Sequence, residues 1–147
     1  MIRSFPRWLA LVLTATYVVA LTAGSLLPSG TEQAGGWDSS ISPTLQNALH
    51  APAYAGLLVL ATLSLPMSAR VSPGALLGTA LACIALGGVL ELAQALVPGR
   101  AADPLDAVLN GAGVVLGVLA VLIWARATRA PAQENHGHAW ESGDQAP

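Results

Sequence analysis

Four apolar runs, each long enough to cross a lipid bilayer, constrain this chain more than any other feature. They cover residues 8–27, 45–65, 74–97 and 104–124. A helix that spans a bilayer needs roughly 20 mostly apolar residues, each adding about 1.5 Å along the helix axis. The spacing therefore predicts an all-α polytopic membrane protein in which four transmembrane helices form one bundle.

The composition agrees with this prediction and excludes several classes of protein. Of the 147 residues, 54% are hydrophobic and only 10% are charged, too few polar groups for an ordinary soluble domain. The net charge of -2, with arginine as the only strongly basic residue, leaves no basic stripe for nucleic acid. The only cysteine, Cys83, lies inside an apolar run, so we expect a buried, unreactive thiol and no disulfide.

The runs predict one membrane domain over residues 1–130. Residues 131–147 mix Pro, Gln, Gly, His and acidic residues without periodicity, which is typical of a disordered tail. A cleaved signal peptide is the competing interpretation of the first run, because Arg3 and Arg7 precede it. The apolar region of such peptides is shorter, however, at roughly 7–15 residues. We therefore expect a first membrane helix over residues 8–27.

Two of the runs carry signals for their helix ends. Pro52 lies near the start of the 45–65 run, where it either occupies the first turn or kinks the helix just after His50. The 104–124 run begins with Asp103 as N-cap, Pro104 as first helical residue and Asp106 in the first turn. These residues suit the unpaired amides and the positive end of a helix dipole.

The arginines predict the orientation of the helices. Five of the six fall on one side of four spans: Arg3, Arg7, Arg70, Arg126 and Arg129. Positively charged short loops stay in the cytoplasm, so we expect a multi-pass plasma-membrane protein with both termini and the tail in the cytoplasm. The sixth, Arg100, falls in the opposite loop between the last two runs, which indicates a local role.

Polar side chains gather at the predicted non-cytoplasmic level of the bundle. An ionisable group at the centre of a span costs roughly 2.5–3.5 kcal/mol, so Glu91 needs a partner or a purpose. Three helices and one loop supply the candidate ligand-binding residues His50, Tyr54, Glu91, Gln94, Arg100, Asp106 and Asn110. Helix caps and interhelical hydrogen bonds are the structural explanations for single members, and Asp103 is interpreted chiefly as a cap.

The residue types indicate the chemistry of such a site. A low dielectric favours the neutral form of Glu91 unless Arg100 or His50 lies close, so Glu91 and His50 are the candidate catalytic residues for proton transfer. Arg100 offers a planar fork for phosphate or carboxylate. No His/Asp pair has ligand spacing on one helix, so we predict no metal, and no motif indicates a cofactor or a strong nucleophile.

Four glycines predict a close helix contact. Gly113 and Gly117 form a small-xxx-small pair that lets another helix approach, and Gly87 and Gly88 offer a matching surface. We therefore expect the 74–97 and 104–124 helices to pack there. If these faces are not used inside one chain, homo-oligomerisation remains open.

An ordered series of residues resembles the VanZ-like family, small bacterial membrane proteins named for a teicoplanin-resistance protein. The series is Ser25-Leu26-Leu27-Pro28, His50, Tyr54, Glu91-x-x-Gln94, Pro98-Gly99-Arg100, Asp106, Asn110, Gly113 and Gly117. The chain departs from the family in having Gln46-Asn47 where Asp-Lys is usual. A role that needs those two charges is therefore not carried over to this chain.

The resemblance implies a role in the cell envelope. In the protein for which the family is named, that role is a lower sensitivity to teicoplanin. The resemblance does not establish an enzyme. Our leading hypothesis is a non-cytoplasmic site that binds or acts on a membrane lipid or a lipid-linked, anionic cell-wall precursor. A second hypothesis is an acid/base enzyme acting on a phospholipid or polyprenyl-phosphate. A third is a non-catalytic scaffold or partner-binding subunit in which the polar residues only lock helices together.

Overall fold

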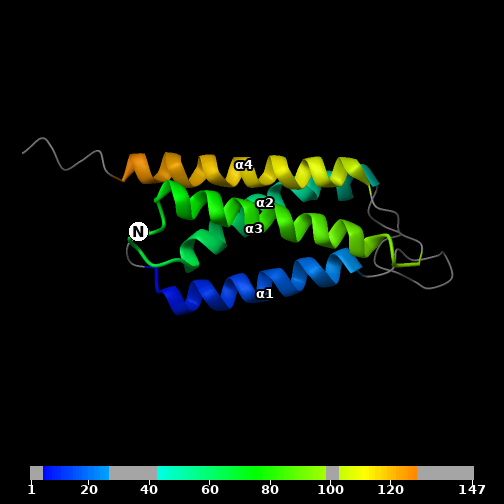
Figure 1. The fold of residues 1–147 in the computed structure, drawn as a ribbon, viewed down its shortest axis with the longest axis horizontal. Helices are drawn as coiled ribbons and strands as arrows, with labels where there is room; N and C mark the ends of the chain where they lie inside the picture. The colour runs from blue at the N-terminus through cyan, green and yellow to red at the C-terminus, as the bar shows by residue number, and fades with distance from the viewer. Residues whose placement is uncertain (1–4, 27–42, 99–102, 129–147) are drawn as a thin grey trace, which may run out of the picture.

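Four helices make up the described part of the computed structural model, which comprises residues 5–26, 43–98 and 103–128. They are α1 (Arg7–Leu26), α2 (Pro43–Ser64), α3 (Pro73–Gln94) and α4 (Pro104–Ala127), and these residues include no strand. Figure 1 shows the helices lying side by side, each running opposite to the one before it in the chain. The predicted tail over residues 131–147 lies outside the described residues.

The helix ends agree with the predicted runs to within three residues. α3 ends at Gln94 rather than Val97, because the N–H groups of Leu96 and Val97 bond to carbonyls only three residues back. Such tighter bonds are common at helix ends, and Pro98 disfavours helix at the residue before it. α4 continues past Trp124 to Ala127 with Arg126 in its last turn, where a cation complements the helix dipole.

Local signals at the start of α4 are confirmed. The Asp103 carboxylate accepts a hydrogen bond from the backbone N–H of Leu105 at 2.9 Å, and Pro104 is the first helical residue. In contrast, Pro52 lies in the interior of α2, which already begins at Pro43. The interpretation that Pro52 occupies a first turn is therefore wrong.

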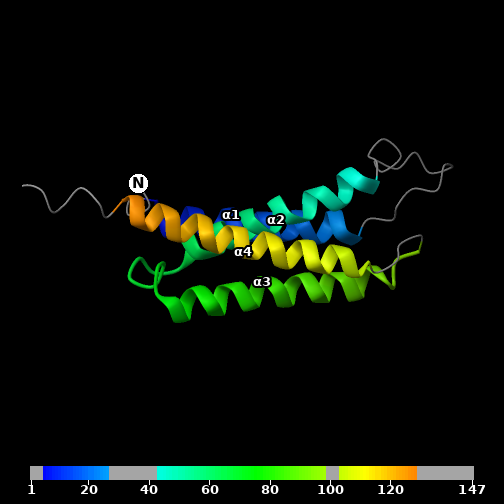
Figure 2. The same cartoon turned by 90° about the horizontal axis from the view of Figure 1, so that it is seen from above.

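Three of the helices, α1, α3 and α4, are long and apolar enough to cross a membrane. α2 has 22 residues but carries the polar side chains of Asn47 and His50 in its first half. It is the central helix, packing most extensively against α4 and also against α1 and α3. Figure 2 shows α2 and α4 crossing along the middle of the bundle. A helix enclosed by others tolerates polar side chains where they meet partners.

The glycine stripe of α4 packs against α2. A Cβ atom built on Gly113 would overlap the backbone of Ala51, and one built on Gly117 would lie 2.9 Å from the Ala55 carbonyl oxygen and from Leu58. The prediction that this stripe packs against α3 is therefore wrong. The sequence shows which face of α4 is small, but α2 offers small residues, Ala51 and Ala55, to receive it.

The two glycines of α3 differ in their surroundings. A Cβ atom on Gly87 would lie 3.1 Å from the Tyr54 ring and 3.2 Å from Asn110 Nδ2, so Gly87 makes room for side chains of α2 and α4. Gly88 is exposed and has open space around it. Gly87 therefore takes part in helix packing, and the prediction that Gly88 does so is wrong.

The buried core is apolar, and so is much of the surface. Tyr54, Leu58, Cys83 and Val114 belong to one buried cluster near the middle of the bundle. Large apolar side chains such as Leu92 are exposed on the outward faces of the helices. An apolar outer surface is expected for helices that lie in lipid.

Basic side chains link neighbouring segments of the chain at the end of the bundle where α1 begins and α4 ends. Arg7 Nε donates a hydrogen bond to the Ser64 carbonyl oxygen at 3.0 Å, and the buried Arg70 donates to the carbonyl oxygens of Leu65 and Phe5. With Arg126 in the last turn of α4, three arginines lie at the end where α1 begins and α4 ends. Arg3 and Arg129 are outside the described ranges.

We expect Gly113→Ala to destabilise the bundle, because the new methyl group would meet the Ala51 backbone and push α2 away from α4. The expected cost is about 1–3 kcal/mol, as for other overpacked sites. Gly111→Ala is the matched control, since the space beside Gly111 is open. Buried Cys83, the only cysteine, makes the temperature of thiol labelling in detergent micelles a measure of unfolding. Equal labelling temperatures for the two variants would contradict the close contact.

Candidate functional site

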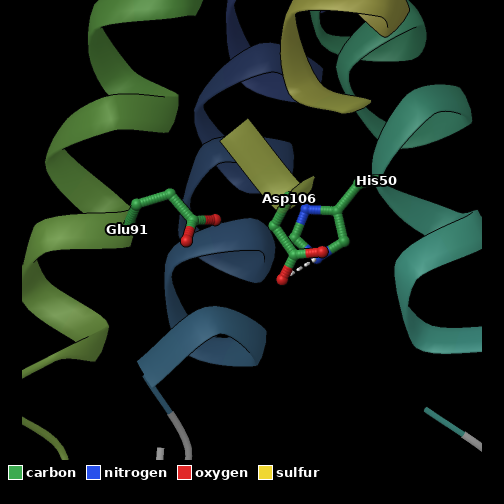
Figure 3. A group of neighbouring side chains, drawn as sticks. All are labelled: His50, Glu91 and Asp106. Carbon is green, nitrogen blue, oxygen red and sulfur yellow. Dashed lines mark ion pairs between the residues drawn. The ribbon is translucent and has the colours of Figure 1, made fainter. Parts of the chain in front are cut away.

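His50, Glu91 and Asp106 meet at one end of the bundle, and we call these three residues the polar cluster. They come from α2, α3 and α4, and each offers one nitrogen or oxygen atom within 4.8 Å of the others. Figure 3 shows the Glu91 side chain extending toward the His50 ring and the Asp106 carboxylate. The cluster lies where α3 ends and α4 begins, the end predicted to be non-cytoplasmic.

The two ring nitrogens of His50 have different neighbours. Nδ1 lies 2.8 Å from Asn110 Oδ1, and Nε2 lies 3.5 Å from Asp106 Oδ2. Because an amide oxygen can only accept a hydrogen bond, Nδ1 carries a hydrogen and donates it to Asn110. Nε2 is then left facing a carboxylate, either as the second N–H of an imidazolium or as a lone pair. A lone pair in that position is satisfied by a protonated carboxyl group, a bridging water or a cation.

Glu91 has one oxygen that is left without a partner. Its side chain is buried, with 7% of the residue exposed. The backbone N–H of Asp103 donates a hydrogen bond to the Glu91 carboxyl group, but Oε2 has no hydrogen-bond partner among the described residues. Leaving a buried acceptor unpaired costs roughly 1–3 kcal/mol, and more for a charged group. Oε2 is therefore placed where a proton, a cation or a ligand group would be stabilised.

Buried neighbours hold the polar cluster in place. Asn110 is almost fully buried and fixes the orientation of the His50 ring. Tyr54 is equally buried and lies beside Gly87, which leaves room for both Tyr54 and Asn110. The structure therefore brings Tyr54 and Asn110 next to the polar cluster as supporting residues.

Two predicted site residues lie elsewhere or outside the described ranges. Gln94 is buried, but its Nε2 donates a hydrogen bond to the Ser25 carbonyl oxygen at 3.1 Å and so links α3 to the end of α1. Arg100 and the side chain of Gln46 lie outside the part of the chain that the structure describes. The placement of Arg100 beside the polar cluster stays a prediction.

The chemistry of the polar cluster differs from the predicted anion site. Two carboxylates beside one imidazole carry negative charge unless protons or a cation neutralise them. The cluster therefore suits proton transfer or cation binding better than direct contact with an anion. The expectation of no metal considered only ligand spacing along one helix, whereas His50, Glu91 and Asp106 come from three helices. The sequence did contain a signal for a metal site, because three apolar runs each carry an ionisable residue at the same predicted level of the membrane.

Comparisons with known proteins support the resemblance seen in the sequence. The family model VanZ/LLP1 matches residues 6–125, a range that includes the whole polar cluster and nearly all of the four helices. The search of curated proteins and the search of solved structures each found no match. Since the matched range covers most of the chain, the protein belongs to the VanZ/LLP1 family.

Proposed function

We propose that the protein is a multi-pass protein of the plasma membrane, with α2 as the fourth membrane helix and both termini in the cytoplasm. Three helices have the length and apolar character of membrane spans, and α2 is packed against all of them. Arg7, Arg70 and Arg126 lie together at one end, which supports a cytoplasmic assignment for that end. The polar cluster then faces the cell envelope.

We propose that the polar cluster binds or acts on a lipid-linked, anionic component of the cell envelope. The observation that carries this proposal is the convergence of three ionisable side chains from three helices, with one buried Glu91 oxygen left unpaired. Buried polar groups that serve only packing are normally satisfied within the protein. An open acceptor in this position therefore supports a site that a ligand completes.

The charge of each residue in this site determines which group of the ligand it is proposed to contact. The carboxylates of Glu91 and Asp106 would repel a bare phosphate, so their proposed contacts are with hydroxyl or amide hydrogens of the ligand. His50 and Glu91 can exchange protons with such groups. Arg100, in the loop that joins α3 to α4, would supply positive charge for a phosphate at headgroup level. A lipid-linked cell-wall precursor offers all of these groups.

Cellular complementation tests this function. We expect a deletion strain to become more susceptible to a teicoplanin-type glycopeptide, and Glu91→Gln, Asp106→Asn and Arg100→Ala to fail to restore growth at the wild-type drug concentration. Thr79→Val is the matched control, because Thr79 lies about three helical turns from Glu91 and its hydroxyl donates only to the Ala75 carbonyl oxygen of the same helix. Full rescue by Glu91→Gln and Asp106→Asn would remove the cluster from the function.

A second candidate function is an acid/base enzyme on a phospholipid or polyprenyl-phosphate, favoured by the proximity of Glu91 to His50. Lipid profiling of the same strains separates the two candidates. Catalysis predicts that the substrate accumulates in the deletion and Glu91→Gln strains but not in the Thr79→Val strain. An unchanged set of envelope lipids and cell-wall precursors would contradict catalysis and leave binding.

The stability of Glu91→Gln separates a functional site from a purely structural one. Glutamine has nearly the same shape, keeps an acceptor for the Asp103 N–H and removes a buried ionisable group, so we expect thermal stability in detergent to stay equal or rise. Gln94→Ala, which loses the hydrogen bond to Ser25, should lower the stability by about 1 kcal/mol. Labelling of Cys83 during heating measures both. If Glu91→Gln is the less stable variant, the cluster only locks helices together.

A further inference from the structure

We infer that the polar cluster binds a divalent cation, with His50 Nε2 and one carboxylate oxygen each from Glu91 and Asp106 as its protein ligands. The inference deepens the proposed function and rests on it only in treating this cluster as a ligand site. Cation binding can be measured on the purified protein, without reference to any envelope ligand.

The spacing of the ligand atoms fits a shared cation. His50 Nε2 and Asp106 Oδ2 are 3.5 Å apart. Two ligand atoms that each lie about 2.1 Å from a tetrahedral ion are separated by about 3.4 Å. A Glu91 oxygen lies within 4.8 Å of one ligand atom of each of the other two residues, and a change in side-chain torsion can bring it closer. Figure 3 shows the Glu91 carboxyl group reaching toward the other two side chains.

The unpaired oxygen of Glu91 is a second observation that points to a ligand. Oε2 is buried, belongs to a side chain that is more than nine-tenths buried, and has no hydrogen-bond partner in the described part of the chain. Protonating His50 would pair its Nε2–H with Asp106 but would still leave Oε2 unsatisfied. A divalent cation serves all three side chains at once and neutralises two carboxylates in a low-dielectric setting.

Asn110 holds His50 in the form that a metal requires. By accepting the Nδ1–H hydrogen bond at 2.8 Å, Asn110 leaves Nε2 free to present its lone pair toward Asp106. Histidines that bind metals generally donate their other ring N–H to an oxygen in this way, which fixes the tautomer and the ring orientation. Gly87 leaves the space that keeps Asn110 in place.

The donor set favours transition-metal cations. One imidazole nitrogen and two carboxylate oxygens suit Zn²⁺ or Mn²⁺, whereas Mg²⁺ and Ca²⁺ prefer oxygen ligands alone. The side chains of His50 and Asp106 are 20% and 14% exposed, so the cluster is open on one side. Three protein ligands with an open position are typical of catalytic rather than structural metal sites. A cation here would attract a phosphate oxygen, a group shared by phospholipid headgroups and lipid-linked precursors.

Metal titration of the purified full-length chain tests the inference. The protein, carrying a purification tag without histidine, is stripped with a chelator in detergent and titrated with Mn²⁺ or Zn²⁺ salts alone. Loss of the free Mn²⁺ electron paramagnetic resonance signal and competition with a zinc indicator report binding. We expect Asn110→Leu to weaken binding about 10–100-fold, as for other residues that orient metal ligands, and Glu91→Gln, Asp106→Asn and His50→Gln to weaken it at least as much.

Two controls keep the result specific to the polar cluster. His136 and His138 in the tail can bind metals, but every variant shares them, so only the difference between variants counts. Thr79→Val, remote from the polar cluster, should bind like the wild type, and Mn²⁺ should raise the Cys83 labelling temperature of the wild type but not of Glu91→Gln. Equal affinity in wild type, Glu91→Gln and Asp106→Asn would overturn the inference, as would a wild-type protein that binds neither metal. Lost binding in cluster variants that still restore drug tolerance would support the cation and contradict the proposed function.

Discussion

The close approach of α2 to α4 is the contact on which the rest of the structure depends. Gly113 and Gly117 bring the α4 backbone against Ala51 and Ala55 of α2, and this fixes the register of two antiparallel helices. His50 directly precedes Ala51, and Asn110 and Asp106 lie about one and two helical turns before Gly113. The same register that removes space between the helices therefore sets His50 against both polar residues of α4.

α3 completes the polar cluster through residues one turn to either side of Glu91. Gly87 lets α3 lie close to the Tyr54 ring and Asn110, and Gln94 fastens the end of α3 to the Ser25 carbonyl of α1. Residues three or four positions apart share one face of a helix, so Gly87, Glu91 and Gln94 all point inward. Packing and hydrogen bonding of these neighbours therefore fix the position of Glu91 along the bundle, since α3 contains no basic residue that could pair with it.

The helices could be predicted from the sequence because their lengths and ends depend on nearby residues. Which helices pack against each other could not be predicted in this way. Long apolar runs, the Asp103 cap and Pro98 set the helix ends, and alternating directions placed the polar residues at one level. The partner of the Gly113 stripe depends on which helix offers an equally small face, and the sequence contains two such helices. Gln94 was expected near Glu91, but the packing of α1 turns its amide toward Ser25.

Charge decides which kinds of function the polar cluster can serve. A site with Glu91, Asp106 and a neutral His50 is anionic, so it opposes the anionic ligands that the family resemblance implies. The proposed cation would reverse that sign, and by linkage a phosphate that contacts the cation would raise the affinity of the protein for the metal. The proposed cation would therefore account both for the buried, unpaired Glu91 oxygen and for the proposed contact with a phosphate-bearing ligand.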